Sequence, residues 1–263
     1  MADGTAELKD RLAAVAADPS QRPLLVALDF DGTLAPLQDD PSRSAITADG
    51  VAVLERLAAL PQVTLALVSG RSMADLHKLA TVPAGTVLIG SHGAERARRT
   101  RFGLDRAVVR LTDEQADLLA ALGARAAAVA RGRDGVWVES KPTAVVVHSR
   151  LAPRDVAAVA CDEALALGAN TGVDVMKGKD VVELSVLHAD KGAALTALRD
   201  ELGAELVLYA GDDVTDERAF AALRPDDVTV KVGDGDTSAA YRVPGTEELV
   251  DALGGFADAL AGS

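Results

Sequence analysis

Five short, continuous runs of apolar residues constrain the fold of this chain more than any other feature. Each run ends in small or polar residues, and stretches rich in alanine and leucine lie between the runs. Continuous apolar runs are typical of strands buried on both faces of a parallel sheet, whereas alternating runs are typical of half-exposed strands. The sequence therefore predicts a doubly wound α/β core with a parallel sheet. The predicted strands are 24–30, 63–70, 86–93, 205–213 and 228–234, and the predicted helices are 51–60, 72–79, 191–202 and 215–223.

The middle of the chain follows a different pattern. It reads as helix, two strands, helix and two strands, which indicates an α+β unit inserted into the core. Its first helix opens with Thr112 three residues before Gln115, a capping-box pattern. We expect a core of residues 1–104 and 188–263 and an inserted unit of residues 105–187. The predicted elements of that unit are helices 112–130 and 153–167, strands 135–141 and 144–150, and a hairpin over 173–186 that turns at Lys177-Gly178-Lys179.

The composition limits the kinds of partner. Acidic residues outnumber basic ones by 40 to 27, which gives a net charge of −13 and argues against general nucleic-acid binding. We expect a small-molecule substrate and no membrane association, because no window approaches the ~18 apolar residues of a membrane span. Residues 1–20 lack an apolar segment flanked by bases, so no signal peptide is expected. The one cysteine, Cys161, cannot form an internal disulfide, and we expect a cytoplasmic protein. The oligomeric state does not follow from the sequence, and a monomer is taken as the default.

Two carboxylates, Asp29 and Asp31, lie one residue apart at the end of the first predicted strand. One of them could attack an electrophile while the other handles protons. Gly32 then allows a tight turn and offers backbone N–H groups to an anion. The alternative is an Asp-Gly turn that does no more than end the strand.

Two further strand ends or helix starts carry groups suited to phosphate. Ser69-Gly70-Arg71 supplies a hydroxyl and free amides at a strand-to-helix turn, although Ser-Gly turns are common. Lys191 lies at a helix N-terminus, where a positive charge opposes the helix dipole and is better placed to meet an anion. A solvated surface lysine is the alternative.

The fourth strand end is acidic, with four acids within residues 212–217. Carboxylate oxygens are the ligands that Mg²⁺ prefers, so this segment predicts a site for a hard cation. The alternative is an acid-rich helix N-terminus, which the helix dipole favours without any metal. That alternative explains Asp216 and Glu217 well and Asp212 less well.

These four segments together resemble the motifs of a known superfamily. DFDGTL, VSGR, DKG and GDDVTD, in this order, match the four motifs of the haloacid dehalogenase (HAD) superfamily of aspartyl-phosphate phosphatases. GSHGAE (90–95), ESK (139–141), HSR (148–150), GKDVVEL (178–184) and the end of the fourth motif resemble the trehalose-6-phosphate phosphatase family. The chain departs from that pattern at Ser149, where members more often have Tyr, and at Ser185-Val186, where they often have Arg-Pro.

The resemblance implies a Rossmann-like HAD core with an inserted α+β cap domain, and Mg²⁺-dependent hydrolysis of trehalose 6-phosphate in trehalose biosynthesis. It implies that Asp29 is the nucleophile, that Asp31 is the acid and base, and that Ser69 and Lys191 bind phosphate. The implied Mg²⁺ ligands are Asp29, the backbone carbonyl of Asp31, and Asp212; support from Asp213 or Asp216 stays open.

Substrate selection is expected in the cap, because charged side chains can bind sugar hydroxyls with two hydrogen bonds each. Glu139, Lys141 and Glu183 are the candidates there, with ordinary exposed charge as the alternative. On the core side the candidates are Gly70, Arg71, His92 and Glu95. His148 could be a structural histidine only, and the basic run 96–101 a solvated face, a cap hinge or a phosphate contact.

Two other functions compete with this prediction. One is another capped sugar or polyol phosphatase, or a phosphohexomutase of the same superfamily. The other is a non-catalytic phospho-acceptor domain, which also places aspartates and a lysine on a doubly wound sheet. The inserted unit and Asp31 oppose the second, because Asp31 would hydrolyse the phosphoaspartate that a signalling domain must keep.

Overall fold

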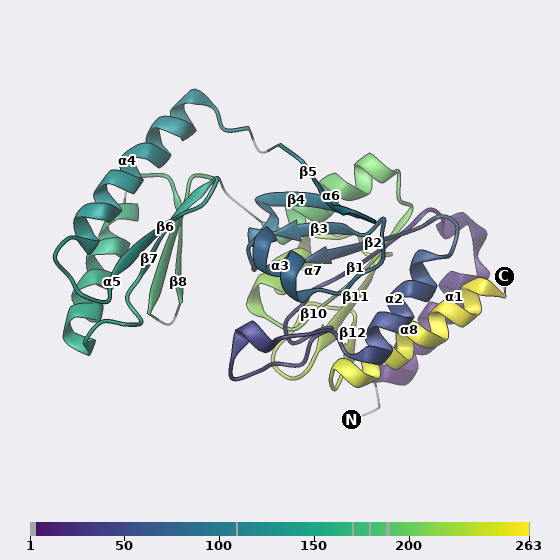
Figure 1. The fold of residues 1–263 in the computed structure, drawn as a ribbon. Helices are drawn as coiled ribbons and strands as arrows, with labels where there is room; N and C mark the ends of the chain where they lie inside the picture. Colours follow the sequence, from purple (N-terminus) through teal and green to yellow (C-terminus); the bar gives the residue numbers. More distant parts are fainter. Residues whose placement is uncertain (1–3, 109, 170, 179, 188–189, 263) are drawn as a thin grey trace. The chain divides into compact units, whose positions relative to one another are not determined.

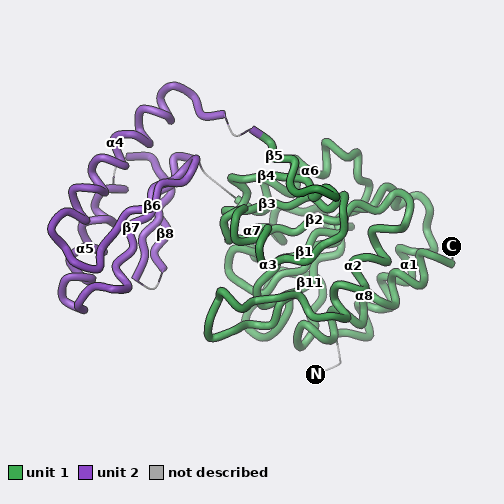
Figure 2. The backbone as a smooth tube through the Cα atoms, viewed as in Figure 1, with its two compact units in different colours: residues 1–107, 190–263 green, residues 108–189 purple. Residues whose placement is uncertain are grey.

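The computed structural model describes residues 4–108, 110–169, 171–178, 180–187 and 190–262. The chain forms two compact units, residues 1–107 with 190–263 and residues 108–189 (Figure 2). The first unit thus extends past the predicted limit at residue 104. The reason is that Asp105 and Arg106 still pair with the neighbouring strand of its sheet.

Within the described residues, the first unit is built on an eight-stranded sheet (Figure 1). All neighbouring strands from β12 to β3 are parallel, and β4 and β5 continue the sheet antiparallel. This parallel core confirms the predicted α/β class. The strand order is β12 (Tyr241–Val243), β11 (Val228–Val232), β10 (Leu206–Gly211), β1 (Leu24–Leu28), β2 (Val63–Val68), β3 (Val87–Gly90), β4 (Glu95–Thr100) and β5 (Gly103–Arg106).

The central strands are buried along their whole length, as their continuous apolar sequences predict. Their side chains alternate between the two faces, so that Val26 joins one apolar cluster and Ala27 the other. The register places Leu28 beside both Ala210 and Leu67. The carboxyl ends of β10, β1 and β2 therefore lie level at one edge of the sheet, where the predicted site residues follow them.

Helices cover both faces of this sheet. Side chains of α1, α2, α3 and α8 pack into one apolar cluster, and those of α6 and α7 pack into the other. Figure 1 shows α1, α2 and α8 side by side on one face. The helices are α1 (Gly4–Ala17), α2 (Ala48–Ala58), α3 (Met73–Leu79), α6 (Lys191–Leu202), α7 (Val214–Ala222) and α8 (Thr246–Ala261), with short 3₁₀ turns at Pro19–Gln21, Pro41–Arg43 and Ser91–Gly93.

The basic run at residues 96–101 forms most of β4, which the sequence did not predict as a strand. Ala97 is buried in it while Arg98 is exposed, so only one side of the strand faces the core. Arg96 pairs with Glu201, and Arg98 donates to the carbonyl oxygen of Gly85. Arg96 and Arg98 therefore lie on a strand between β3 and β5 and bind neighbouring parts of the first unit.

No helix among the described residues of the chain is long and apolar enough to cross a membrane.

The second unit is an antiparallel sheet with two helices. Val145, Val147 and Leu184 pack against the helices on one face of the sheet. The predicted capping box of Thr112 and Gln115 is present. Of the predicted hairpin turn, Lys179 lies outside the described residues. The elements are α4 (Asp113–Ala130), α5 (Arg154–Gly168) and strands in the order β6 (Trp137–Ser140), β7 (Ala144–His148), β9 (Val181–Ser185), β8 (Asp174–Gly178).

Candidate active site

A pocket of about 300 Å³ lies in the first unit at the carboxyl ends of its central strands. It follows directly from the sheet: the Asp29 N–H donates to Ala210 and the Ser69 N–H to Ile89, which extends the strand pairing to the site. Residues from four predicted motifs meet there. The lining residues are Asp29, Asp31, Leu37, Ser69, Gly70, Arg71, His92, Lys191, Asp212 and Asp213.

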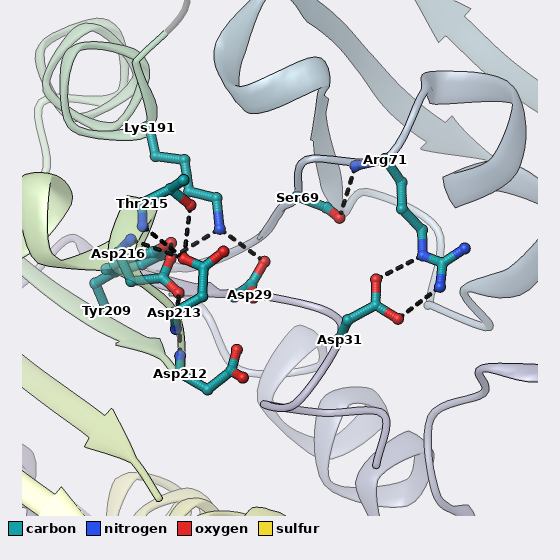
Figure 3. A network of polar contacts seen from close by, with 10 residues as sticks. All are labelled: Asp29, Asp31, Ser69, Arg71, Lys191, Tyr209, Asp212, Asp213, Thr215 and Asp216. Atoms are coloured by element: carbon teal, nitrogen blue, oxygen red, sulfur yellow. Dashed lines mark hydrogen bonds and ion pairs between the residues drawn. The ribbon is translucent and has the colours of Figure 1, made fainter. Parts of the chain in front are cut away.

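The Lys191 ammonium is the centre of the buried charge in this pocket (Figure 3). Its Nζ lies 3.0 Å from Oδ1 of Asp29 and 2.8 Å from Oδ1 of Asp216. All three side chains are almost inaccessible, with exposed fractions of 2%, 6% and 0%. Lys191 is the first residue of α6, where Asp190 caps the helix, so its start fixes the ammonium beside the strands.

Burial and pairing act in opposite directions on these groups. Burial lowers the pKa of Lys191, but the carboxylates of Asp29 and Asp216 outweigh that effect and raise it above its usual value. The ammonium therefore stays charged. Burial raises the pKa of Asp29 well above its usual value, and Lys191 offsets only part of that rise. A carboxylate in this position needs additional positive charge to stay ionised.

The acidic residues after β10 provide a donor set for a cation. Oxygen atoms of Asp29, Asp212 and Asp216 lie within 4.8 Å of one another. Gly32 has a φ of +74°, and a Cβ there would lie 2.0 Å from the Asp212 carboxylate, so only glycine leaves room for that side chain. Burial raises the pKa of Asp212 to about 6, with Asp216 and Asp213 adding to it. Such crowded carboxylates suit Mg²⁺, which takes oxygen ligands.

Asp216 differs from Asp29 and Asp212 because each of its carboxylate oxygens already accepts two hydrogen bonds. Oδ1 accepts hydrogen bonds from Lys191 and from the Tyr209 hydroxyl, at 2.8 and 2.5 Å. Oδ2 accepts the backbone N–H groups of Asp212 and Asp213, both at 3.0 Å. Asp213 caps α7, and its Oδ1 accepts the N–H groups of Thr215 and Asp216. Asp29 and Asp212 are therefore the carboxylates best placed to hold a metal.

The Asp31 side chain is turned away from Asp29 and toward Arg71 (Figure 3). Nε and one terminal nitrogen of Arg71 donate to its two oxygens at 2.5 and 2.7 Å. The same guanidinium donates to Ser44 Oγ and to the carbonyl oxygen of Pro41. Arg71, which the sequence predicted as a substrate ligand, thus orients Asp31 in this structure.

The remaining core-side candidates lie in two neighbouring turns. The His92 ring covers Gly70, where a Cβ would lie 2.4 Å from it, and His92 has a left-handed φ of +56°. The hydroxyl of Ser69 accepts the Arg71 N–H at 3.2 Å. Glu95 lies outside the pocket lining; its Oε1 accepts the Ser91 hydroxyl at 2.7 Å and the Met73 N–H at 3.1 Å.

The three inserted-unit candidates share one face of the second unit's sheet. Glu139 and Glu183 both pair with Val146 of β7, and their neighbours in the strands point to the opposite, helix-covered face. Lys141 Nζ lies 2.7 Å from Glu183 Oε2. Glu139 Oε2 lies 2.8 Å from His148 Nε2. The structure therefore brings together residues that are up to 44 positions apart, from 139 to 183.

Comparison with known proteins identifies the family. A sequence model of trehalose-phosphatases matches residues 27–247. The chain belongs to the trehalose-phosphatase family. This confirms the family that its motifs indicate.

Curated relatives match across most of the chain. The trehalose-6-phosphate phosphatase of Escherichia coli is 32% identical over 224 residues, which cover 84% of this chain and 82% of that protein. The trehalose-phosphate phosphatase of Mycobacterium marinum is 35% identical over 254 residues, which cover 90% of this chain and 62% of that protein. The chain thus spans less than two thirds of the length of this mycobacterial relative.

Solved structures share the fold. A trehalose-6-phosphate phosphatase related protein is 27% identical, with a TM-score of 0.66, and the match covers 87% of this chain and 95% of that one. The C-terminal domain of a Candida albicans trehalose-6-phosphate phosphatase is 22% identical, with a TM-score of 0.69 and 97% of both chains covered. The second likeness shows the fold alone.

The two departures from the family pattern have local partners. Ser149 is buried, and its N–H and hydroxyl both donate to the carbonyl oxygen of Asp180. The Ser185 hydroxyl donates to the carbonyl oxygens of Leu187 and Thr143 at 2.8 and 3.3 Å. Both serines therefore fasten strand ends within the second unit.

Tyr209 and Lys231 are among the site residues that were missed from the sequence. Tyr209 lies inside the apolar run of β10 and reads as an ordinary core residue, yet its hydroxyl binds Asp216. Lys231 lies in the apolar run of β11, is 5% exposed, and donates to the carbonyl oxygen of Asp212. A lysine inside a strand that is predicted to be buried on both faces was the signal that could have found Lys231.

Proposed function

We propose that this chain is a Mg²⁺-dependent phosphatase that hydrolyses trehalose 6-phosphate through an aspartyl-phosphate on Asp29. The observation that carries the proposal is the buried Asp29 carboxylate, held 3.0 Å from Lys191 at the base of an open pocket. Its family, and relatives named trehalose-phosphate phosphatase, support the substrate. A fixed carboxylate beside a fixed ammonium suits in-line attack on a phosphate ester.

In the first half of the reaction an Asp29 oxygen forms a bond to phosphorus, and the ester bond to the sugar oxygen breaks. Asp31 donates a proton to the departing sugar oxygen, which leaves as the neutral hydroxyl of trehalose. Asp31 lines the same pocket as Asp29 and is partly exposed. It can therefore reach the sugar oxygen of a substrate that binds in the pocket from solvent.

In the second half a water molecule attacks the same phosphorus. Asp31, now ionised, accepts the proton of that water, and the bond between Asp29 and phosphorus breaks to release inorganic phosphate. Both the carboxylate and the acid are then restored. Arg71 donates two hydrogen bonds to the Asp31 carboxylate, which fix the orientation of its side chain.

Phosphate oxygens would bind to Lys191, to the Ser69 hydroxyl and to the amides around Gly70. Asp29, Asp212 and the backbone carbonyl of Asp31 would hold Mg²⁺. When bound, this cation neutralises repulsion between the nucleophile and the phosphate and stabilises the charge that develops in transfer.

His92 and Arg71 also line the pocket and could contact the leaving group. Because Glu95 Oε1 already binds Ser91 and Met73, its part would be to hold the His92 turn.

We further propose that the second unit is the cap that selects the sugar. Glu139, Lys141 and Glu183 are half-buried or exposed charges on the sheet face without helices, where carboxylates and an ammonium can bind several hydroxyls. A disaccharide offers more such hydroxyls than a monosaccharide does.

Phosphate release from trehalose 6-phosphate tests the proposal. Wild-type protein with Mg²⁺ is expected to release phosphate, and Asp29→Asn to lose at least about 1,000-fold in kcat, because the amide is a poor nucleophile. Asp10→Asn, an exposed α1 residue, is the matched control and should behave as wild type. Retained turnover by Asp29→Asn would contradict the mechanism, and a clear preference for a monosaccharide phosphate would contradict the substrate.

A further inference from the structure

Tyr209 carries a buried hydroxyl that no step of the proposed reaction uses. Its side chain is fully buried in β10, and its hydroxyl lies 2.5 Å from Oδ1 of Asp216. The same Asp216 oxygen accepts a hydrogen bond from Lys191. We propose that Tyr209 is a positioning residue, which fixes the catalytic ammonium of Lys191 by locking the carboxylate between them. The inference rests on the proposed function, since Lys191 acts there on the phosphoryl group.

The direction of the third Lys191 donor depends on the two carboxylates that the ammonium binds. An ammonium has three N–H donors, and within the described residues two of them reach Asp29 and Asp216. The third is left for a phosphate oxygen in the pocket that Lys191 lines. Where that third donor points depends on where Asp29 and Asp216 stand. Asp29 must itself change partners when it attacks, so Asp216 is the constant reference.

The Asp216 side chain is held through both of its carboxylate oxygens. Its Oδ2 accepts two backbone N–H groups of the turn after β10, which fix one oxygen. The terminal torsion of aspartate is soft, and rotation about it moves both carboxylate oxygens together. The Tyr209 hydroxyl donates to Oδ1, so it resists this rotation at the second oxygen, which is also the acceptor for Lys191.

Tyr209 itself is rigid. Its backbone pairs with Ala27 of β1 and Thr229 of β11, and its ring packs against Phe220 of α7 with 5.7 Å between the ring centres. Burial raises the pKa of Tyr209 well above its usual value, and Asp216 adds to the rise, so the hydroxyl keeps its proton and acts as the donor. The neutral Tyr209 hydroxyl can thus hold the Asp216 carboxylate and leave its negative charge to pair with the Lys191 ammonium.

Tyr209→Phe removes the hydroxyl alone and tests the inference. We expect kcat for trehalose 6-phosphate to fall on the order of ten- to one hundred-fold, as for loss of one hydrogen bond to a charged group, with KM changed less than about threefold. Tyr241→Phe removes a hydroxyl from β12 and is the matched control, expected to match wild type. Thermal unfolding of both variants shows whether each is folded.

A second background separates positioning from general damage. The effect of Tyr209→Phe on turnover of an aryl phosphate is measured in both backgrounds. In Lys191→Met no ammonium is left to position, so adding Tyr209→Phe should lower the residual turnover by less than about twofold, against a loss on the order of tenfold or more in the wild-type background. An equal loss in both backgrounds, or Tyr209→Phe turnover within twofold of wild type, would overturn the inference. If Tyr209→Phe does not fold, Asp216→Asn takes its place in the same cycle. Wild type that turns over aryl phosphate but not trehalose 6-phosphate would refute the proposed substrate and leave this test in force.

Discussion

Charged side chains are held very differently in the pocket of the first unit and on the open sheet face of the second. The side chains of Lys191, Asp29 and Asp216 are at most 6% exposed. On the open face, Lys141 and Glu183 are 16% and 23% exposed, and Glu139 is 46% exposed. Breaking a buried charge pair costs about 3–5 kcal/mol, whereas exposed pairs contribute about 1 kcal/mol or less.

This difference fits the proposed division of roles, in which the first unit carries out phosphoryl transfer and the second unit recognises the sugar. Phosphoryl transfer needs fixed groups, because small displacements of the nucleophile or its partner are costly in rate. Sugar recognition needs groups that can give up one partner for another, and a partly buried pair such as Lys141 and Glu183 can do so at a lower cost than the buried pairs of the pocket. We therefore expect substitutions in the pocket to act on kcat and those on the sheet face to act on KM.

Beside Asp29→Asn, the substitution expected to have the largest effect in sharpening this contrast is Asp212→Asn. It removes one of the two carboxylates best placed for Mg²⁺, and kcat should fall at least about 100-fold even at high Mg²⁺ concentration. Mg²⁺ should also raise the thermal unfolding midpoint of wild type more than that of the variant. The exposed Asp234→Asn is the control. Normal stabilisation by Mg²⁺ in Asp212→Asn would refute Asp212 as a ligand.

A smaller effect is expected for Lys141→Met on the open face. KM for trehalose 6-phosphate should rise about tenfold with kcat within threefold, because one charged contact to the sugar is lost while the pocket is unchanged. Lys177→Met is the matched control, since Lys177 pairs with Val182 and belongs to the opposite face. A fall in kcat at constant KM for Lys141→Met would break the contrast between the two regions.

The parts of the fold that followed from the sequence are those in which local pattern and tertiary role agree. β1, β2 and β10 are apolar because both of their faces are covered, so a continuous run sufficed to find them. The helix after Thr112 has its capping box within four residues. β4 was missed because its sequence is not an apolar run: Ala97 is buried between Arg96 and Arg98, which bind Glu201 and Gly85 elsewhere in the first unit.

The sequence predicted which of these residues meet at the carboxyl edge of the sheet, but not the direction of their side chains. The turn at Asp31 and the turn at Arg71 belong to different strand ends, and their pairing depends on the distance that the sheet sets between them. Glu95 binds Ser91, four residues earlier in the same turn, and the Met73 N–H at the start of α3, a contact that depends on the packing of α3 beside this turn. Tyr209 was missed because the position of its hydroxyl over Asp216 arises only when α7 packs on β10.

The central claim is that the first unit carries out the chemistry and the second selects the sugar. The most direct measurement compares wild type with the triple variant Glu139→Gln, Lys141→Met and Glu183→Gln on two substrates, trehalose 6-phosphate and an aryl phosphate without a sugar. We expect kcat/KM for trehalose 6-phosphate to fall at least about 100-fold while that for the aryl phosphate stays within threefold. Equal losses on both substrates, or no loss on trehalose 6-phosphate, would contradict the account.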